Sequence, residues 1–143
     1  VATRVGGLDL VMVGPNDPEA MRRHTEECRT RGIPFVADPS QQLAFADGPF
    51  IRNLVEGADY LFTNEYEAAL TEQKTGWTAA DILDRVGCRV TTKGAAGAIV
   101  ERKGNRVGFL GYWCGDPAEA RAAAELKLPA KRATSSCPEA STR

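Results

Sequence analysis

Short apolar runs of strand type alternate with amphipathic segments of helix type through the first 92 residues. The strand-type runs are "LDLVMVG" at 8–14, "IPFVAD" at 33–38, "DYLFTN" at 59–64 and "CRVTTKG" at 88–94. The helix-type segments between them span about 17–31, 50–55, 64–76 and 78–86. Strands that alternate with helices predict an α/β fold with a mostly parallel sheet, helical cover and right-handed crossovers.

The first helix-type segment carries its own start and stop signals. Asp17 is a residue type that caps helix N-termini. Met21, Thr25 and Cys28 recur on one face, with charged residues mostly elsewhere. Gly32 stands where glycine commonly ends a helix. A helix over about 17–31 with one buried face is therefore predicted.

The pattern changes after the fourth strand-type run. Residues 96–111 alternate as an antiparallel β-hairpin does, with "KGN" at 103–105 as its turn. Residues 112–128 contain one Ala-rich helical stretch, and the tail at 129–143 is rich in Pro, Ser, Thr and Arg with little to bury. We expect an α/β domain over 1–111, a helix within 112–128 and a disordered tail over 129–143.

Composition and charge narrow the classes of partner. Hydrophobic residues make up 43% of the 143 residues and charged residues 26%, which is enough for a packed core. The net charge of −1 gives no broad attraction to nucleic acid or to an anionic membrane, so neither is expected as a partner. No apolar run approaches the roughly 20 residues that span a bilayer, and no signal-peptide pattern opens the chain.

The cysteines and the single histidine argue against a zinc site. The four cysteines are widely spaced and form no C-x-x-C pair: Cys28, Cys88, Cys114 and Cys137. His24 lies among charged helix residues and is expected at the surface. Reduced cysteines in a cytoplasmic protein are the simplest interpretation.

Polar residues end three of the strand-type runs. Asp38, Asn64 and Thr92 each stand at the carboxyl end of a different strand. In open parallel sheets, ligands bind beyond the carboxyl ends of the strands. This coincidence is the clearest functional indication in the sequence.

Each of these residues also has a purely structural interpretation. Asn64 and Glu67 have the spacing of a helix capping box, and the same pair could order water around Mg²⁺. Thr92 begins "TKGAAG", which is either a glycine turn into the hairpin or a hydroxyl, a phosphate-binding Lys93 and open N–H groups facing a polyphosphate. Asp38 precedes a proline turn and could start an Asx-type turn. Spacing alone leaves these alternatives open.

Taken together, the motifs resemble a known family. "DLVMVGPNDPEAM", "FVADPSQQ", "GADYLFTNEYE" and "RVTTKGAAGAIVERKG" are similar in order and interval to the central part of the ribokinase-like (PfkB) carbohydrate and nucleoside kinases, and of bacterial adenosine-kinase-like members in particular. The resemblance runs from about Gly7 to about Gly104. Its specific feature is an N-x-x-E after one strand together with a T-x-G-x-x-G after the next.

The resemblance implies cofactors and roles. It implies ATP and Mg²⁺ as cofactors and a sugar or nucleoside as the small-molecule partner. Asn64 and Glu67 match the motif that holds Mg²⁺ through water and the phosphates, and Thr92 and Gly94 match the motif that contacts the ATP phosphates. Asp38 matches a polar position near the transferred phosphate.

The chain also departs from the family pattern. The N-terminal half of the family, which supplies the lid and most acceptor contacts, has no counterpart here. The catalytic D-x-x-G-x-G-D should follow the hairpin, where "LGYWCGD" instead has Leu110 and Trp113 at the first Asp and first Gly. Asp116 is a weak candidate for the base at this place, and an N-cap before Pro117 is its structural interpretation. A frameshift after about Leu110 would explain the departure, and translating the flanking DNA in all frames would test it.

We therefore expect a fragment of an ATP-dependent sugar or nucleoside kinase that transfers the γ-phosphate to a hydroxyl and is inactive as this isolated chain. The first residue, Val1, fits a fragment and fits processing equally well. The alternatives are a non-catalytic α/β nucleotide- or phosphate-binding or interaction module, and a gene remnant without a selected function. Acceptor identity and oligomeric state are not set by the sequence.

Overall fold

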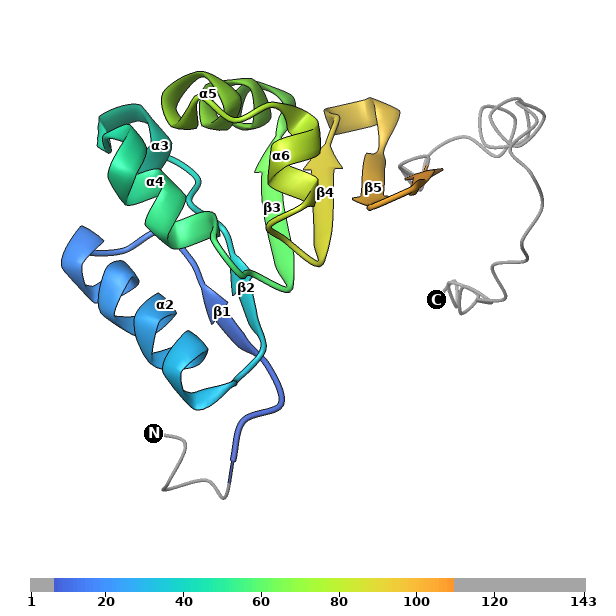
Figure 1. Cartoon of the computed structure of the whole chain (residues 1–143). Coiled ribbons are helices and arrows are strands. Elements are labelled where there is room, and N and C mark those ends of the chain that lie inside the picture. The colour runs from blue at the N-terminus through green and yellow to red at the C-terminus, as the bar shows by residue number, and fades with distance from the viewer. Residues whose placement is uncertain (1–6, 110–143) are drawn as a thin grey trace, which may run out of the picture. The chain divides into compact units, whose positions relative to one another are not determined.

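A computed structural model of the chain describes residues 7–109, all of which lie in one compact unit (Figure 1). The strands are β1 (Val11–Val13), β2 (Phe35–Ala37), β3 (Tyr60–Asn64), β4 (Cys88–Thr92), β5 (Ala98–Arg102) and β6 (Asn105–Phe109). The helices are α2 (Pro18–Arg31), α3 (Gln42–Phe45), α4 (Gly48–Val55), α5 (Glu65–Thr75) and α6 (Ala79–Leu83), with a short 3₁₀ turn, η1, at Gly94–Ala96. The segments predicted at 112–128 and 129–143 lie outside the described residues.

The six strands form one sheet in the order β1-β2-β3-β4-β5-β6. The first four strands pair in parallel and the last two pairings are antiparallel. The α/β fold class, the mostly parallel sheet and the C-terminal hairpin are therefore confirmed. Because β1 to β4 run the same way, their carboxyl ends meet at one edge of the sheet.

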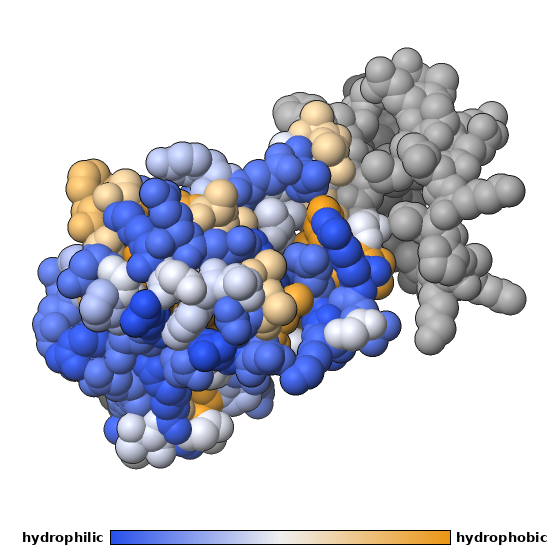
Figure 2. All heavy atoms as spheres, turned by 45° about the horizontal axis from the view of Figure 1, so that its top comes forward, coloured by the Kyte–Doolittle hydropathy of each residue, from blue (hydrophilic) through white to orange (hydrophobic). Residues whose placement is uncertain are grey.

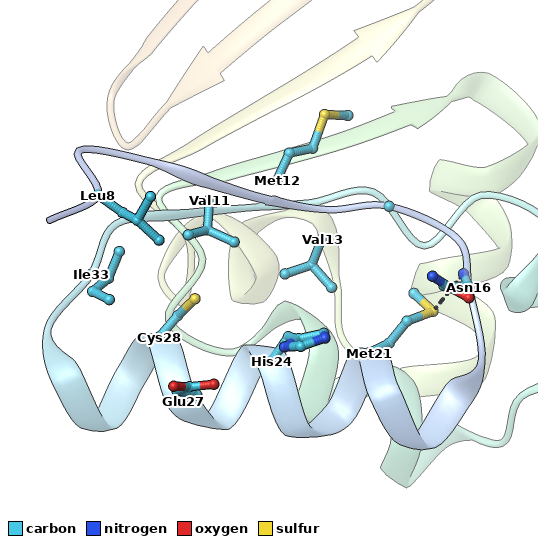
Figure 3. Close-up of a pocket in the computed structure, with 11 residues that line it drawn as sticks. Leu8, Val11, Met12, Val13, Asn16, Met21, His24, Glu27, Cys28 and Ile33 are labelled. Atoms are coloured by element: carbon cyan, nitrogen blue, oxygen red, sulfur yellow. Dashed lines mark hydrogen bonds between the residues drawn. The ribbon is translucent and has the colours of Figure 1, made fainter. Parts of the chain in front are cut away.

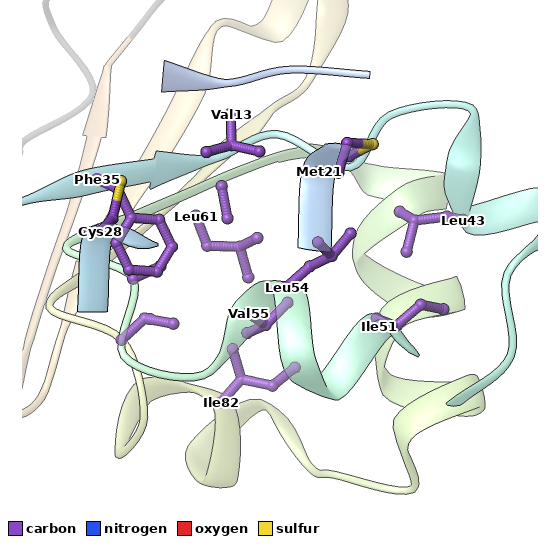
Figure 4. Packing of buried hydrophobic residues seen from close by; sticks show 13 residues of the cluster. Val13, Met21, Cys28, Phe35, Leu43, Ile51, Leu54, Val55, Leu61 and Ile82 are labelled. Carbon is purple, nitrogen blue, oxygen red and sulfur yellow. The ribbon is translucent and has the colours of Figure 1, made fainter. Parts of the chain in front are cut away.

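The core lies between the parallel strands and helices α2, α4 and α6 (Figure 4). Strand residues Val13, Phe35 and Leu61 point into it, and they meet buried helix residues including Ile51 and Ile82, which are fully buried. The predicted stripe of α2 is also confirmed, since its Met21, Thr25 and Cys28 are buried. Alternation in the strands and the 3.6-residue period in the helices thus supply the two sides of one core.

Arginine and lysine side chains link neighbouring helices by donating hydrogen bonds to backbone carbonyls near the helix C-termini. Arg29 donates to the carbonyl of Asn53 at 2.7 and 2.8 Å, and Arg52 donates to the carbonyl of Thr75 near the end of α5. Lys74 donates to the carbonyls of Ala44 and Ala46 at 3.0 and 2.8 Å. These groups satisfy C-terminal carbonyls that a helix leaves without partners.

The first strand differs from the prediction of a buried strand over residues 8–14. Only Val11–Val13 is paired, and it lies at the edge of the sheet. Leu10 is 48% exposed and Met12 is 63% exposed. The run of apolar residues predicted a strand buried on both faces of the sheet. The described helices cover only the face that carries Val11 and Val13.

Three short elements also differ from their predicted bounds. The "PSQQ" turn leads into helix α3, which the sequence analysis missed, and α4 begins earlier than expected because Asp47 accepts a hydrogen bond from the N–H of Phe50 at 2.9 Å. Helix α6 ends at Leu83 instead of continuing to Val86. Four- and five-residue helices have too little periodicity to be read from a pattern.

Two further observations concern the cysteines and the length of the helices. Cys28 and Cys88 are buried free thiols, and burial raises the pKa of the Cys28 thiol. Among residues 7–109, no helix is long and apolar enough to cross a membrane.

Candidate phosphate-binding site

The parallel pairing brings the predicted strand-end residues to one edge. Asn64 pairs in register with Thr92, so the ends of β3 and β4 are level. Ala37 pairs with Leu61, which places Asp38 level with Phe62, two residues further back. At about 3.3 Å per strand residue, Asp38 is recessed by about 7 Å behind Asn64 along the strands.

Asn64 and Glu67 form the predicted capping box at the start of α5. The side-chain Oδ1 of Asn64 accepts from the N–H of Glu67, and the Oε2 of Glu67 accepts from the N–H of Asn64, both at 2.8 Å. These bonds leave the side-chain NH₂ of Asn64 and the Oε1 of Glu67 without partners among the described residues. The capping role is thus real, and it leaves one donor and one carboxylate oxygen for a ligand.

Asp38 has a carboxyl group with no hydrogen-bond partner in the described part of the chain. An Asx-type turn would need that carboxyl to accept a backbone N–H, and the turn is instead held by backbone bonds from Gln42 to Pro39 and from Leu43 to Ser40. Partial burial raises the pKa of Asp38, and the negative charge of Glu67 raises it further. The Asx interpretation is therefore wrong for Asp38, and its carboxyl group is close enough to feel the negative charge of Glu67.

The turn after β4 presents backbone N–H groups. Gly94 has φ +56°, and the turn closes through hydrogen bonds from Lys93 to the Gly97 carbonyl at 2.7 Å and from Gly97 to the Gly94 carbonyl at 3.0 Å. The N–H groups of Gly94 and Ala95 have no acceptor within residues 7–109. Thr92 is exposed beside them. Successive free N–H groups in such a turn form a concavity suited to an anion.

The charges at this edge need a cation if the ligand is a polyphosphate. Asp38, Glu65 and Glu67 are acidic, while Lys93 is basic and pairs with Glu65 at 3.0 Å. Within the described residues, no group of three or more His, Cys, Asp or Glu side chains is arranged to hold a metal directly. Mg²⁺ prefers oxygen ligands and keeps several of its waters, so the carboxylates of Glu67 and Asp38 are of the type that would hold this ion through water.

Two features of this region were missed by the sequence analysis. The sequence did not indicate that Glu65 pairs with Lys93, because neither motif predicts which side chains meet across neighbouring strands. The hydroxyl of Thr63, 4% exposed and next to Asn64, has no hydrogen-bond partner in the described part of the chain. Asp116, the candidate base, lies outside the described residues.

The face of the described residues that Figure 2 shows is mostly hydrophilic, with scattered apolar side chains. A cavity of about 330 Å³ lies elsewhere, between β1 and α2 (Figure 3). Its lining includes Val11, Val13 and Cys28, with His24 exposed as predicted. None of the predicted phosphate-side residues lines this cavity, so it does not belong to the strand-end site.

Known proteins resemble this chain over most of its length. No family model matches it. A nucleoside kinase of Methanocaldococcus jannaschii is 22% identical over 99 residues, which are 69% of this chain and 32% of that kinase. The structure of a Burkholderia thailandensis nucleoside kinase in complex with inosine matches with a TM-score of 0.73 and 35% identity, covering 76% of this chain and 37% of that one.

Two further structures agree. The same Burkholderia kinase in complex with ADP-inosine gives a TM-score of 0.72 at 35% identity, over 76% of this chain and 34% of that one. The crystal structure of the Methanocaldococcus jannaschii nucleoside kinase, an archaeal member of the ribokinase family, gives 0.68 at 21% identity, over 80% of this chain and 39% of that one. The chain thus spans between about a third and two-fifths of the length of these relatives. The chain therefore has, over the part that these structures match, the fold of part of a ribokinase-like (PfkB) kinase, and the solved structures named above are nucleoside kinases.

Proposed function

We propose that this chain is the phosphate-side portion of an ATP- and Mg²⁺-dependent kinase that transfers the γ-phosphate to a hydroxyl of a nucleoside or sugar. The observation that carries the proposal is the level placement of Asn64 and Thr92, which puts N-x-x-E and T-x-G side by side. Between the two acceptor classes, a nucleoside is favoured because the 35% identical relative is a nucleoside kinase in complex with inosine.

The turn after β4 supplies donors for the phosphates in this proposal. The Thr92 hydroxyl and the free N–H groups of Gly94 and Ala95 donate to phosphate oxygens, and the free NH₂ of Asn64 donates from the neighbouring strand. Such preorganised donors stabilise charge at the transferred group without reorganising during the reaction.

The carboxylates act on the cation side. Glu67, through its free Oε1, and Asp38 orient water around Mg²⁺, and the ion neutralises charge on the phosphate chain when bound. Holding a cation between them also relieves the repulsion that raises the pKa of Asp38. The capping bonds hold the Glu67 side chain in one orientation while it does so.

Transfer further requires a group that takes the proton from the acceptor hydroxyl. Asp116 is the candidate for this base. We propose that the isolated chain binds Mg-ATP and does not turn over at a useful rate, in a cytoplasmic setting where its cysteines stay reduced. The second candidate function is a non-catalytic nucleotide-binding module, which would use the same strand-end residues.

Calorimetric titration of the full chain with ATP tests the proposal, with and without Mg²⁺. Binding is expected with Mg²⁺ and at least tenfold weaker in EDTA. Glu67→Gln keeps an oxygen that accepts the Asn64 N–H, so the melting temperature should stay close to wild type while Mg-ATP affinity falls about tenfold. Absence of Mg-ATP binding in a folded wild-type chain would overturn the proposal.

A coupled ADP-release assay tests the expected lack of turnover. Inosine, adenosine, ribose and fructose are offered as acceptors in turn. Acceptor-dependent release that is lost in Asp116→Asn would establish a kinase with Asp116 as its base, and it would overturn both the expected inactivity and the binding module. Mg-ATP binding without release from any acceptor is the result expected of the isolated chain.

A further inference from the structure

An ion pair joins the two motifs of the proposed site. The Nζ of Lys93 lies 3.0 Å from the Oε1 of Glu65. Glu65 directly follows Asn64, and Lys93 directly follows Thr92, so each partner is the next residue after a register-paired strand end. The pair therefore spans the gap between N-x-x-E and T-x-G at the place proposed for the phosphates.

This ion pair is exposed enough to be exchanged. The side chains of Lys93 and Glu65 are 33% and 61% exposed. Pairs of this kind contribute little to folding stability, because water competes for both charges. A phosphate chain offers several oxygens and carries more negative charge than one carboxylate. The Lys93 ammonium therefore interacts at least as favourably with the phosphates as with Glu65.

Lys93 is the basic residue of the two motif segments, "NEYE" and "TKGAAG". Its backbone is held by the hydrogen bond from its N–H to the Gly97 carbonyl at 2.7 Å, within the turn that carries the free N–H groups. The ammonium group is thus positioned by the turn beneath it and by Glu65 beside it. A phosphate bound at the Gly94 and Ala95 N–H groups would lie within reach of the same ammonium.

We propose that Lys93 is a phosphate ligand of the nucleotide, and that the Glu65 carboxylate occupies it in the free protein and is displaced when the nucleotide binds. The inference rests on the proposed function and adds an internal competitor to it. Glu65 lowers affinity because its ion pair with Lys93 must be broken before Lys93 can bind a phosphate. Free anions of low charge compete poorly with Glu65, so the pair favours a polyphosphate.

A double-mutant cycle on the full chain tests this. Mg-ATP affinity is measured for wild type, Glu65→Gln, Lys93→Gln and the double variant. We expect Glu65→Gln to bind about threefold to tenfold tighter and Lys93→Gln about tenfold weaker. The double variant should match Lys93→Gln, because the competitor acts only through Lys93. Lys93→Arg should restore most of the binding.

The matched control is an ion pair of the same kind far from the site. Lys103 pairs with Asp84 at 2.6 Å beyond the other end of β5, so Asp84→Asn should leave affinity within twofold. Equal tightening by Glu65→Gln with and without Lys93 would mean a general charge effect and would overturn the inference alone, as would unchanged affinity in Lys93→Gln. A wild-type chain that binds no Mg-ATP would overturn both the proposed function and the inference.

Discussion

Asn64 allows its structural and ligand-binding roles to be measured separately. Its Oδ1 accepts the N–H of Glu67 at 2.8 Å, while its NH₂ group has no partner among the described residues. Asn64→Ala removes both groups. Asn64→Asp keeps an acceptor for the cap, because Asp and Asn cap helices about equally well, and replaces the donor with a carboxylate oxygen.

The two variants should therefore differ in thermal stability. Loss of an N-cap costs about 1 kcal/mol, which lowers the melting temperature by about 4–8 °C in a domain of about 100 residues. Asn64→Ala should show that loss. Asn64→Asp should melt within a few degrees of wild type, since a carboxylate at a helix N-terminus also interacts favourably with the helix dipole.

Affinity for Mg-ATP should fall in both variants, because both lose the NH₂ donor of Asn64. A hydrogen bond to a charged group is worth about 1.5–3 kcal/mol, so replacing the donor with a negative oxygen should weaken binding by about tenfold or more. Differential scanning fluorimetry gives the melting temperatures and calorimetric titration gives the dissociation constants. Wild-type affinity in Asn64→Asp would show that Asn64 is a cap and nothing more. Early melting of Asn64→Asp would show that the capping argument itself is wrong.

Three further predictions concern stability. Thr63→Val should raise the free energy of unfolding by about 1 kcal/mol in urea titrations, because it removes a buried hydroxyl without a partner; a loss of stability would contradict this. A Cβ on Gly48 would lie 2.2 Å from the Lys74 carbonyl oxygen, so Gly48→Ala should cost about 1–3 kcal/mol by thermal melting, and Gly14→Ala, with open space around it, should not. Burial and Glu67 raise the pKa of Asp38, so the native state binds more protons than the unfolded state and stability falls as pH rises through the interval between the two pKa values. Asp38→Asn should therefore stabilise the protein in urea at pH 7 and have little effect at pH 3, and an equal effect at both would refute the assignment.

Local signals were read correctly where they are strong. The cap at Asp17, the left-handed Gly32 that ends α2, and the reciprocal bonds of Asn64 and Glu67 are all present. The order of strands and helices followed from periodicity, and the family resemblance was confirmed by the structures that match. Helix α3 and the end of α6 were not foreseen, because four or five residues span little more than one helical turn and show no repeat of the pattern. The roles of Thr92 and Gly94 toward a nucleotide stay predictions.

The sequence by itself determined the order of the main strands and helices, where α5 begins, and that polar residues end three strands, because all of these depend on neighbours within a few positions. The tertiary structure decided that Asn64 stands level with Thr92, and that Glu65 meets Lys93. It also decided that Met12 lies on an open face. These outcomes depend on which strands pair, in what register, and what covers each face of the sheet. Strand pairing, register and burial all depend on contacts between residues far apart in the chain, so a local sequence pattern does not predict them.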